Sequence, residues 1–321
     1  MLPHALSSDA CSLAPGVERL AVTGEIELGP GAEPRSARFY RSRIRSDARL
    51  DYDQLDAIFA GRVAPPQEVA EPLAAARAVA GSLGEHRGTT SLDIESAEPE
   101  FRFDAAGNVT AAHRVPQTEA HRLIERLMIL TNEQVAEFLQ RRRVPAIYRV
   151  HAQPDPARIE RLVEQLAALG VPTPPLGQGL STGEAGRVAA EASRLARREA
   201  ARRGHGREAY TSLVLRSLKQ AVYSERNSGH AGLGSAAYTH FTSPIRRYPD
   251  LVVHRALLAA LGEGEEAPRL AEARDIAADC SARERESMKI ERGADDVCAA
   301  YLLERELGER GLDAEFEGEI S

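Results

Sequence analysis

Two adjacent arginines, Arg246 and Arg247, follow a glycine-rich stretch and a Thr-Ser-Pro turn within the segment GHAGLGSAAYTHFTSPIRRYPDLVVHRALL, residues 229–258. The turn places both arginines at the start of an expected helix over about 245–261. Exposed N–H groups at a helix N-terminus and nearby guanidinium groups bind anions and neutralise charge that develops on them. A capped helix whose arginines pair with surface acids would show the same pattern. Local physics favours neither interpretation over the other.

The elements that must position this segment are strands early in the chain and helices late in it. Partial alternation around GPGAEP predicts a hairpin over residues 17–46, and FRFD and NVTAAHRV predict a second one. A short strand, YRVH, follows Pro145. The expected helices cover a short segment capped by Asp51 and residues of about 67–86, 117–139, 156–170, 185–203, 208–223, 245–261 and 268–309. The predicted class is α+β.

Composition describes a globular chain of 321 residues, 43% hydrophobic and 28% charged. Its net charge of −7 argues against wholesale coating by nucleic acid, but phosphate contacts need only a local basic lining. Three cysteines are too few and too far apart for a disulfide framework or a zinc knuckle. The sequence has neither a long apolar run nor a signal-peptide pattern, so we expect a cytoplasmic protein without a membrane partner.

A family resemblance enters with AYTHFTSPIRRYPDLVVHR, which resembles the signature of the ribonuclease II and ribonuclease R (RNB) exoribonucleases. Further segments resemble the family in the same order: RFYRSRIRSDARLDYDQLDAIFAG, HRLIERLMILTNEQVAEFL, PAIYRVHAQPDP and ERESMKIERGADDV. The resemblance implies an RNB-type catalytic domain with N-terminal antiparallel hairpins and a mostly helical C-terminal half. It also implies a monomer that hydrolyses single-stranded RNA processively from the 3′ end to nucleoside 5′-monophosphates, with magnesium assisting the attack of water.

The same matching implies roles for individual residues. Arg246 and Glu291 match catalytic positions, with Arg246 stabilising charge on the phosphate and Glu291 near the 3′-terminal nucleotide. The residues expected to contact RNA are Tyr52, Phe103, Glu125, Tyr238, Thr242, Ser243 and Arg247. Tyr52 and Glu125 resemble a pair that senses the terminal ribose, and Phe103, or else Phe101, resembles a base-stacking aromatic. Without the resemblance, core packing or a solvated helix face would explain the tyrosine, the phenylalanines and the glutamates.

Two basic stretches are candidates for an RNA path, although either would equally suit a solvated face. The first contains Arg35, Arg38, Arg41, Arg43, Arg45 and Arg49. The second contains Arg194, Arg197, Arg198, Arg202, Arg203 and Arg207.

No metal ligand is predicted in this chain. The family places its metal-binding aspartates upstream of a segment resembling VIPMLPHALSSDACSL, and this sequence opens at MLPHALSS. Asp51, Asp53 and Asp56 stand at a helix start, where capping explains acids. His240 and His254 lack ligand-like spacing. We therefore expect residues 1–312 to be an N-terminally truncated RNB domain, inactive alone, and 313–321 to begin an oligonucleotide-binding barrel. The alternative function is a non-catalytic RNA-binding or regulatory module.

Overall fold

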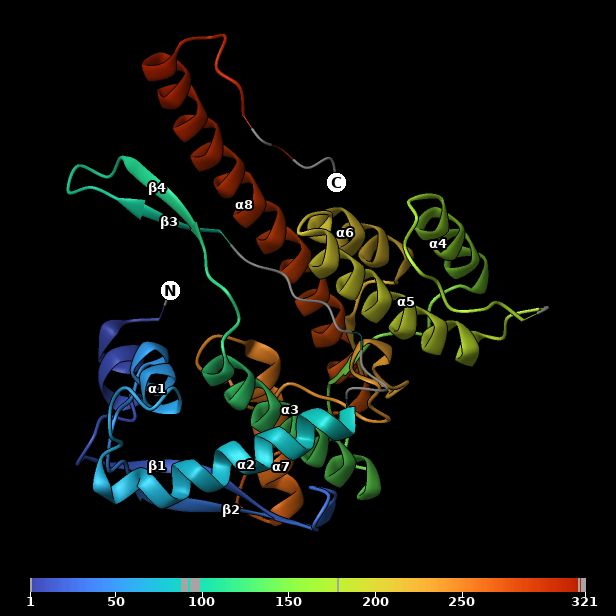
Figure 1. Ribbon diagram of the computed structural model, residues 1–321. Coiled ribbons are helices and arrows are strands. Elements are labelled where there is room, and N and C mark those ends of the chain that lie inside the picture. Colours follow the sequence, from blue (N-terminus) through green and yellow to red (C-terminus); the bar gives the residue numbers. More distant parts are fainter. Residues whose placement is uncertain (1, 88–91, 93–98, 178, 317, 319–321) are drawn as a thin grey trace. The chain divides into compact units, whose positions relative to one another are not determined.

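The computed structural model describes residues 2–87, 92, 99–177, 179–316 and 318 (Figure 1). The chain divides into two compact units, each assembled from segments that are distant in sequence. Unit 1 comprises residues 1–91, 118–152 and 221–278, and unit 2 comprises residues 92–117, 153–220 and 279–321. No helix in the described part is long and apolar enough to cross a membrane.

Unit 1 contains the first predicted hairpin and most of the arginine-bearing segment. Its elements are η1 (Ala5–Ala10), β1 (Glu18–Leu28), β2 (Pro34–Arg45), α1 (Tyr52–Phe59), η2 (Gln67–Val69), α2 (Ala70–Arg87), α3 (Glu119–Arg141), β5 (Tyr148–Val150), β6 (Val222–Ser224), η3 (Ala231–Leu233) and α7 (Tyr248–Leu261). β1 and β2 pair antiparallel from Glu18↔Arg45 to Leu28↔Pro34. Asp51, the N-cap residue of α1, forms a capping box with Gln54, so the predicted cap is confirmed.

The core of unit 1 forms where α2 and α3 pack on the first hairpin. Leu83 of α2, Leu130 of α3 and Ala32 at the hairpin turn form one buried cluster. Phe39 of β2 meets Phe138 of α3 edge to face, with the ring centroids 5.2 Å apart. α3 is therefore the central helix of this unit, and its polar face is available to position other groups.

Unit 2 contains the second hairpin and the helical half. Its elements are β3 (Pro99–Phe103), β4 (Val109–Arg114), α4 (Pro156–Ala168), α5 (Thr182–Arg203), α6 (Arg207–Ser217) and all of α8 (Leu270–Arg310) after residue 278. Leucine and isoleucine side chains of α4 pack against alanines of α5 and against Tyr210 and Val214 of α6. Alanine lets the helices approach closely, which explains the alanine-rich face of α5.

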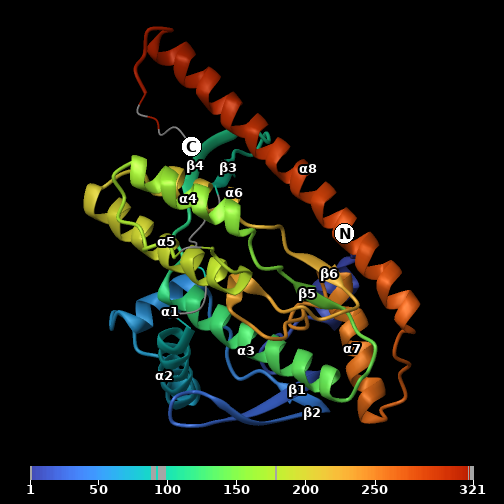
Figure 2. The same cartoon turned by 90° about the vertical axis from the view of Figure 1, so that its right-hand side faces the viewer.

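The α+β class is confirmed, and the differences concern the ends of helices and one short strand that was not expected. The helix expected over 208–223 ends at Ser217, and Val222–Ser224 instead pairs antiparallel with β5 as β6 (Figure 2). The valine and tyrosine of this short run suit a strand. α5 begins earlier than expected, because Ser181 and Glu184 form a capping box. Residues 313–316 form no strand, and the domain boundary predicted at 312 stays a prediction.

Candidate functional site

The segment that leads to the two arginines is anchored to α3 by one buried asparagine. Asn132 accepts a hydrogen bond from the backbone N–H of Phe241 (3.0 Å) and donates one to the hydroxyl of Tyr238 (3.1 Å). Tyr238, predicted to contact RNA, is buried in this arrangement. Its side chain thus helps to attach the segment to α3. The predicted contact with RNA stays a prediction.

Two further elements fix the same segment from other sides. Thr239 donates from its hydroxyl to the carbonyl of Ile147 (2.6 Å), just before β5, and the Arg149 N–H of β5 donates to the Tyr238 carbonyl (2.9 Å). Nε2 of His254, on α7, lies 2.9 Å from the Phe241 carbonyl. α3, β5 and α7 therefore hold the backbone that precedes Arg246.

The glycine-rich stretch lets the chain close tightly on β5. Gly232 donates its N–H to Nδ1 of His151 (3.0 Å), and a Cβ at this position would lie 2.7 Å from the same nitrogen. Gly229 has a φ of +79°, and a Cβ there would lie 3.1 Å from the Ser235 carbonyl. Both positions favour glycine, one because of close approach and one because of backbone conformation.

The two adjacent arginines have different surroundings. Arg247 donates Nε to Oδ2 and Nη2 to Oδ1 of Asp250, both at 2.9 Å, and Oδ1 also accepts the Ser243 N–H (2.7 Å). The Asp250 side chain is 0% exposed. This bidentate pair ties the turn to the first turn of α7, so Arg247 follows the interpretation of an arginine paired with an acid, although that acid is buried.

Arg246 is exposed, and its guanidinium has no hydrogen bond or ion pair to any described residue. Its N–H and that of Arg247 both donate to the Ser243 carbonyl, at 3.2 and 3.1 Å, which closes the turn. Beside it, the buried hydroxyl of Thr242 lacks a hydrogen-bond partner within the described residues. Arg246, Thr242 and Ser243 therefore lie together on a fixed turn, with one guanidinium available for an anion.

The surroundings of this turn are positive but contain neutral imidazoles. Burial, and then the charges of Arg247, Arg149, His230 and Arg246, lower the pKa of His240 to about 2. Its Nδ1 lies 2.8 Å from the Tyr223 hydroxyl. Burial and the neighbouring histidine and arginine also lower the pKa of His230 to about 4. An anion bound at this turn would therefore meet the Arg246 guanidinium and no buried charge on these two imidazoles.

Tyr52 and Glu125 are also in unit 1. Tyr52 begins α1, and its ring stacks on His121 of α3, with centroids 3.9 Å apart and planes inclined by 20°. Glu125 is exposed one helical turn after His121. The structure therefore places both predicted ribose-sensing residues around the first two turns of α3.

Phe103 and Glu291 lie in unit 2. The Phe103 side chain is 58% exposed at the end of β3, whereas Phe101 is half-buried. Glu291 is exposed on α8. Exposure leaves the Phe103 ring free to stack on a base, and the roles implied for these residues stay predictions.

The first basic stretch carries ion pairs. Arg38 pairs with Glu25 across the hairpin and Arg43 pairs with Glu18, all with exposed side chains. Arg41 pairs with acids at residues 263 and 265 after α7. These arginines form a charge-balanced, solvated face.

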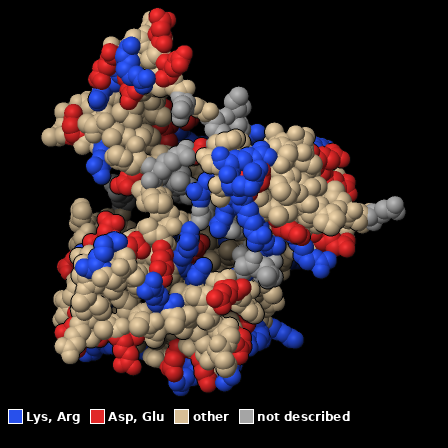
Figure 3. Space-filling view, viewed as in Figure 1, with Lys and Arg blue, Asp and Glu red and all other residues tan. Residues whose placement is uncertain are grey.

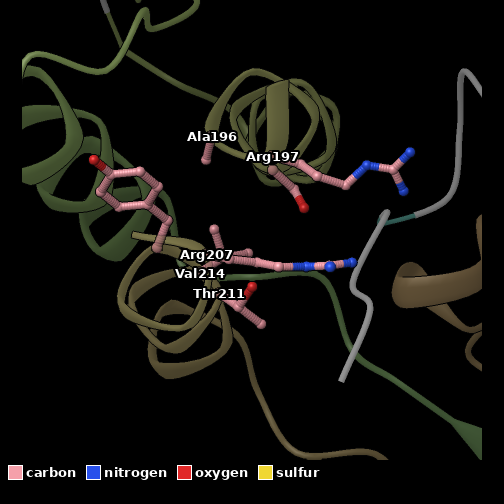
Figure 4. A pocket seen from close by; sticks show the side chains of 7 residues that line it. Ala196, Arg197, Arg207, Thr211 and Val214 are labelled. Atoms are coloured by element: carbon pink, nitrogen blue, oxygen red, sulfur yellow. The ribbon is translucent and has the colours of Figure 1, made fainter. Parts of the chain in front are cut away.

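The second basic stretch is divided. Arg202 and Arg203 both donate to Glu199, whereas Arg197 and Arg207 line a small pocket between α5 and α6 and extend in the same direction (Figure 4). Basic side chains gather over these two helices on the face shown in Figure 3. The other residues that line the pocket are Ser193, Ala196, Tyr210, Thr211 and Val214.

No group of three His, Cys, Asp or Glu side chains in the described part could hold a metal ion. Asp51 caps α1, and Asp56 accepts the Ala120 N–H (3.1 Å). His254 stacks on Phe241 (centroids 4.1 Å apart). Asp51, Asp56 and His254 therefore take part in contacts that stabilise the fold.

Three residues of the site carry little or no signal in the sequence. Asp250 could have been found from its position three residues after Arg247, the spacing of a helical ion pair. Asn132 and His121 stand in a helix among many polar residues, and only tertiary contacts distinguish them.

Comparisons with known proteins identify one family. The RNB domain family matches residues 1–263. Ribonuclease R of Vibrio parahaemolyticus is 36% identical over 84% of this chain and 32% of its own length, and ribonuclease R of Aquifex aeolicus is 35% identical over 96% and 43%. The structure of Mycoplasma genitalium RNase R with ribose-methylated single-stranded RNA matches with a TM-score of 0.85 and 27% identity, over 95% of this chain and 48% of that one. The chain spans less than half of each, and it belongs to the RNB domain family.

Proposed function

We propose that this chain serves in the exonucleolytic hydrolysis of RNA from the 3′ end to nucleoside 5′-monophosphates. The observation that carries the proposal is the pair of adjacent arginines. Asp250 fixes Arg247 and the turn, and Arg246 next to it presents an exposed guanidinium without a partner among the described residues. Ribonuclease R relatives that match the chain support RNA as the substrate.

In this proposal the Arg246 guanidinium binds the scissile phosphate and stabilises the charge that develops on its oxygens. Stabilisation of this kind depends on a donor that is already oriented before the reaction, since reorganising it would cost free energy. The Asp250–Arg247 pair and the anchoring of Tyr238 and Phe241 to Asn132 hold the backbone of the turn from which Arg246 extends. Because its pKa is lowered, His240 nearby is neutral and carries no charge that would change the binding of the phosphate.

The family resemblance implies magnesium, and the described residues do not fit it. A magnesium site is usually built around carboxylate oxygens that converge on one point, and in the part of the chain that the structure describes no group of three His, Cys, Asp or Glu side chains could hold a metal ion. No step is therefore assigned to a metal. The roles proposed for this chain's own residues are to bind the phosphate, orient the 3′ end through Tyr52 and Glu125, and stack bases on Phe103.

The test uses a 5′-labelled oligoribonucleotide, on which removal of 3′ nucleotides produces a ladder of shortening products. Chain 1–321 is compared with an extended form, to whose N-terminus the aspartate-bearing segment of a ribonuclease R relative is fused, each with magnesium. We expect shortening by the extended form, and a loss of about 10²- to 10³-fold in its rate with Arg246→Ala, the usual effect of removing one oriented donor. Arg38→Ala is the matched control, because it removes an arginine from the solvated hairpin face.

The alternative function is a non-catalytic RNA-binding module, and the lack of a metal-donor group in the described residues is the observation that favours it. Both proposals expect chain 1–321 to bind RNA more weakly after Arg246→Ala. Binding without shortening in the extended form, with Arg246 intact, would favour the binding module. Shortening at an unchanged rate with Arg246→Ala would contradict the role given to Arg246.

A further inference from the structure

A stacked pair of rings joins the start of α1 to the start of α3. The Tyr52 and His121 rings are nearly parallel, with centroids 3.9 Å apart and planes inclined by 20°. Tyr52 is 43% exposed, so contact with His121 leaves much of its ring open to a ligand. Because tilting either ring would lose contact area, the stack fixes the plane in which the phenol lies.

His121 is itself held in place. Its Nδ1 lies 2.7 Å from the hydroxyl of Thr118, the residue that precedes α3. Thr118 occupies the N-cap position, yet its hydroxyl makes no capping hydrogen bond to the helix. The hydroxyl is therefore hydrogen-bonded to the imidazole and not to the helix backbone. This bond sets the rotation of the His121 ring.

The two helices are also joined by contacts that do not involve the rings. Asp56 of α1 accepts the N–H of Ala120 (3.1 Å), one of the first-turn donors that lack a partner within α3. Leu55 of α1 is buried. These contacts hold α1 against α3 independently of the two rings. We therefore expect α1 to stay in place when either ring is replaced.

Glu125 follows His121 by four residues, so the two side chains are neighbours on one face of α3, with Cβ atoms about 5–6 Å apart. Glu125 is exposed. A flat phenol for packing against a sugar and a carboxylate for accepting a hydroxyl therefore flank the imidazole.

We propose that His121 is a positioning residue for recognition of the 3′-terminal ribose. It sets the plane of the Tyr52 ring, against which the sugar packs, one helical turn from the Glu125 carboxylate that accepts the 2′-hydroxyl. This inference rests on the proposed function and adds to it a determinant of the choice between RNA and DNA.

The test measures dissociation constants of chain 1–321 for two oligoribonucleotides that differ only in the terminal sugar, ribose or 2′-deoxyribose. Discrimination is the dissociation constant for the 2′-deoxyribose end divided by the dissociation constant for the ribose end. We expect His121→Ala to lower this ratio by about two- to tenfold, the range that an aromatic stack provides. His121→Phe keeps a flat ring but loses the hydrogen bond to Thr118, and Thr118→Val loses the same bond and keeps the imidazole, so each should give a ratio between those of the wild type and His121→Ala. His86→Ala, an exposed histidine on α2, is the control.

A second measurement does not depend on RNA. The NMR shifts of the Tyr52 ring protons, observed in the free chain, should move with His121→Ala and stay near their original values with His121→Phe. Movement of the ring signals together with a reduced ratio supports positioning by the stack.

Three results would overturn the inference in distinguishable ways. An unchanged ratio with His121→Ala removes the role of His121 and leaves the proposed function intact. An equal loss with His121→Phe shows that the stack is not the cause. Wild-type chain that does not bind 3′ ends, compared with circular RNA of the same sequence, contradicts the proposed function itself and the inference with it.

Discussion

Two pairs of adjacent arginines meet buried acids in different ways. In α5, Glu199 precedes Arg202 and Arg203 by three and four residues, and both guanidiniums donate to its carboxylate. At the turn before α7, Asp250 follows Arg247 by three residues and receives only that arginine. Both arginines of the first pair are bound to an acid, whereas in the second pair Arg246 is available to bind a ligand.

The position of the acid explains the difference. Residues three and four apart on a helix face the same side, so both arginines of α5 reach one carboxylate. Arg246 and Arg247 stand in a turn before the helix begins, where successive side chains diverge. In this chain, the pair of adjacent arginines leaves one guanidinium available where the backbone geometry prevents both from reaching the same acid.

The largest predicted effect is on the acid that holds the turn. Asp250→Ala should lower the free energy of unfolding by about 3–5 kcal/mol, because it leaves the Arg247 guanidinium and the Ser243 N–H without their buried partner. Urea unfolding followed by circular dichroism measures the change. Asp279→Ala, which removes an acid from an exposed pair with Arg283, should leave the midpoint unchanged. Equal effects of the two substitutions would contradict the role of Asp250.

The next prediction uses His240 as a reporter of the positive surroundings of the turn. Its folded-state pKa of about 2 lies below its ordinary value of 6.5, so below pH 6.5 the unfolded chain binds the proton more readily. Stability is complete above pH 6.5 and is lost as the pH falls towards the folded-state pKa. At pH 5 the loss from this residue is about 2 kcal/mol.

His240→Gln keeps an acceptor for the Tyr223 hydroxyl but does not titrate. Unfolding measured at pH 7 and pH 5 should therefore show a smaller loss in this variant than in the wild type. Part of the loss should remain, because burial also lowers the pKa of His230. The same pH dependence in both proteins would show that the imidazole is not neutral in the folded chain.

Glu199 tests the other arginine pair. Hydrogen bonds from Arg202 and Arg203 lower its pKa from 4.5 to about 2. Its contribution to stability is therefore present above pH 4.5 and is lost as the pH falls towards 2. Glu199→Gln should destabilise unit 2 at pH 7, less than Asp250→Ala destabilises unit 1 since Arg202 is largely exposed. In this variant the thermal midpoint should also fall less between pH 4.5 and pH 2 than it does in the wild type. An equal fall in both proteins would contradict the pairing.

The smallest effect on stability should come from Arg246. Arg246→Ala removes a side chain without a partner among the described residues, so the free energy of unfolding should change by no more than about 0.5 kcal/mol, while binding of RNA weakens. Thermal melting and RNA titration of the same preparation separate the two. A clear loss of stability would mean that Arg246, like Arg247, is held by the fold.

Much of the architecture was predictable from local patterns. The hairpins around GPGAEP and AAG, the Asp51 cap and the end of α4 before Gly170 follow from turn residues and caps that act within a few positions. β6 could not be predicted, because three residues become a strand only through pairing with β5, which lies more than seventy residues earlier.

The features of the candidate site also divide into those that follow from local sequence patterns and those that depend on distant segments. The sequence by itself determined the family, the α+β class and the arginine-bearing turn, since these depend on residue types at short spacing. Tertiary structure alone decided that Arg246 has no partner among the described residues, that Asn132 donates a hydrogen bond to Tyr238, and that His121 stacks on Tyr52. The physical reason is that the partner of a charged or aromatic group is selected by packing of distant segments, which no local pattern encodes.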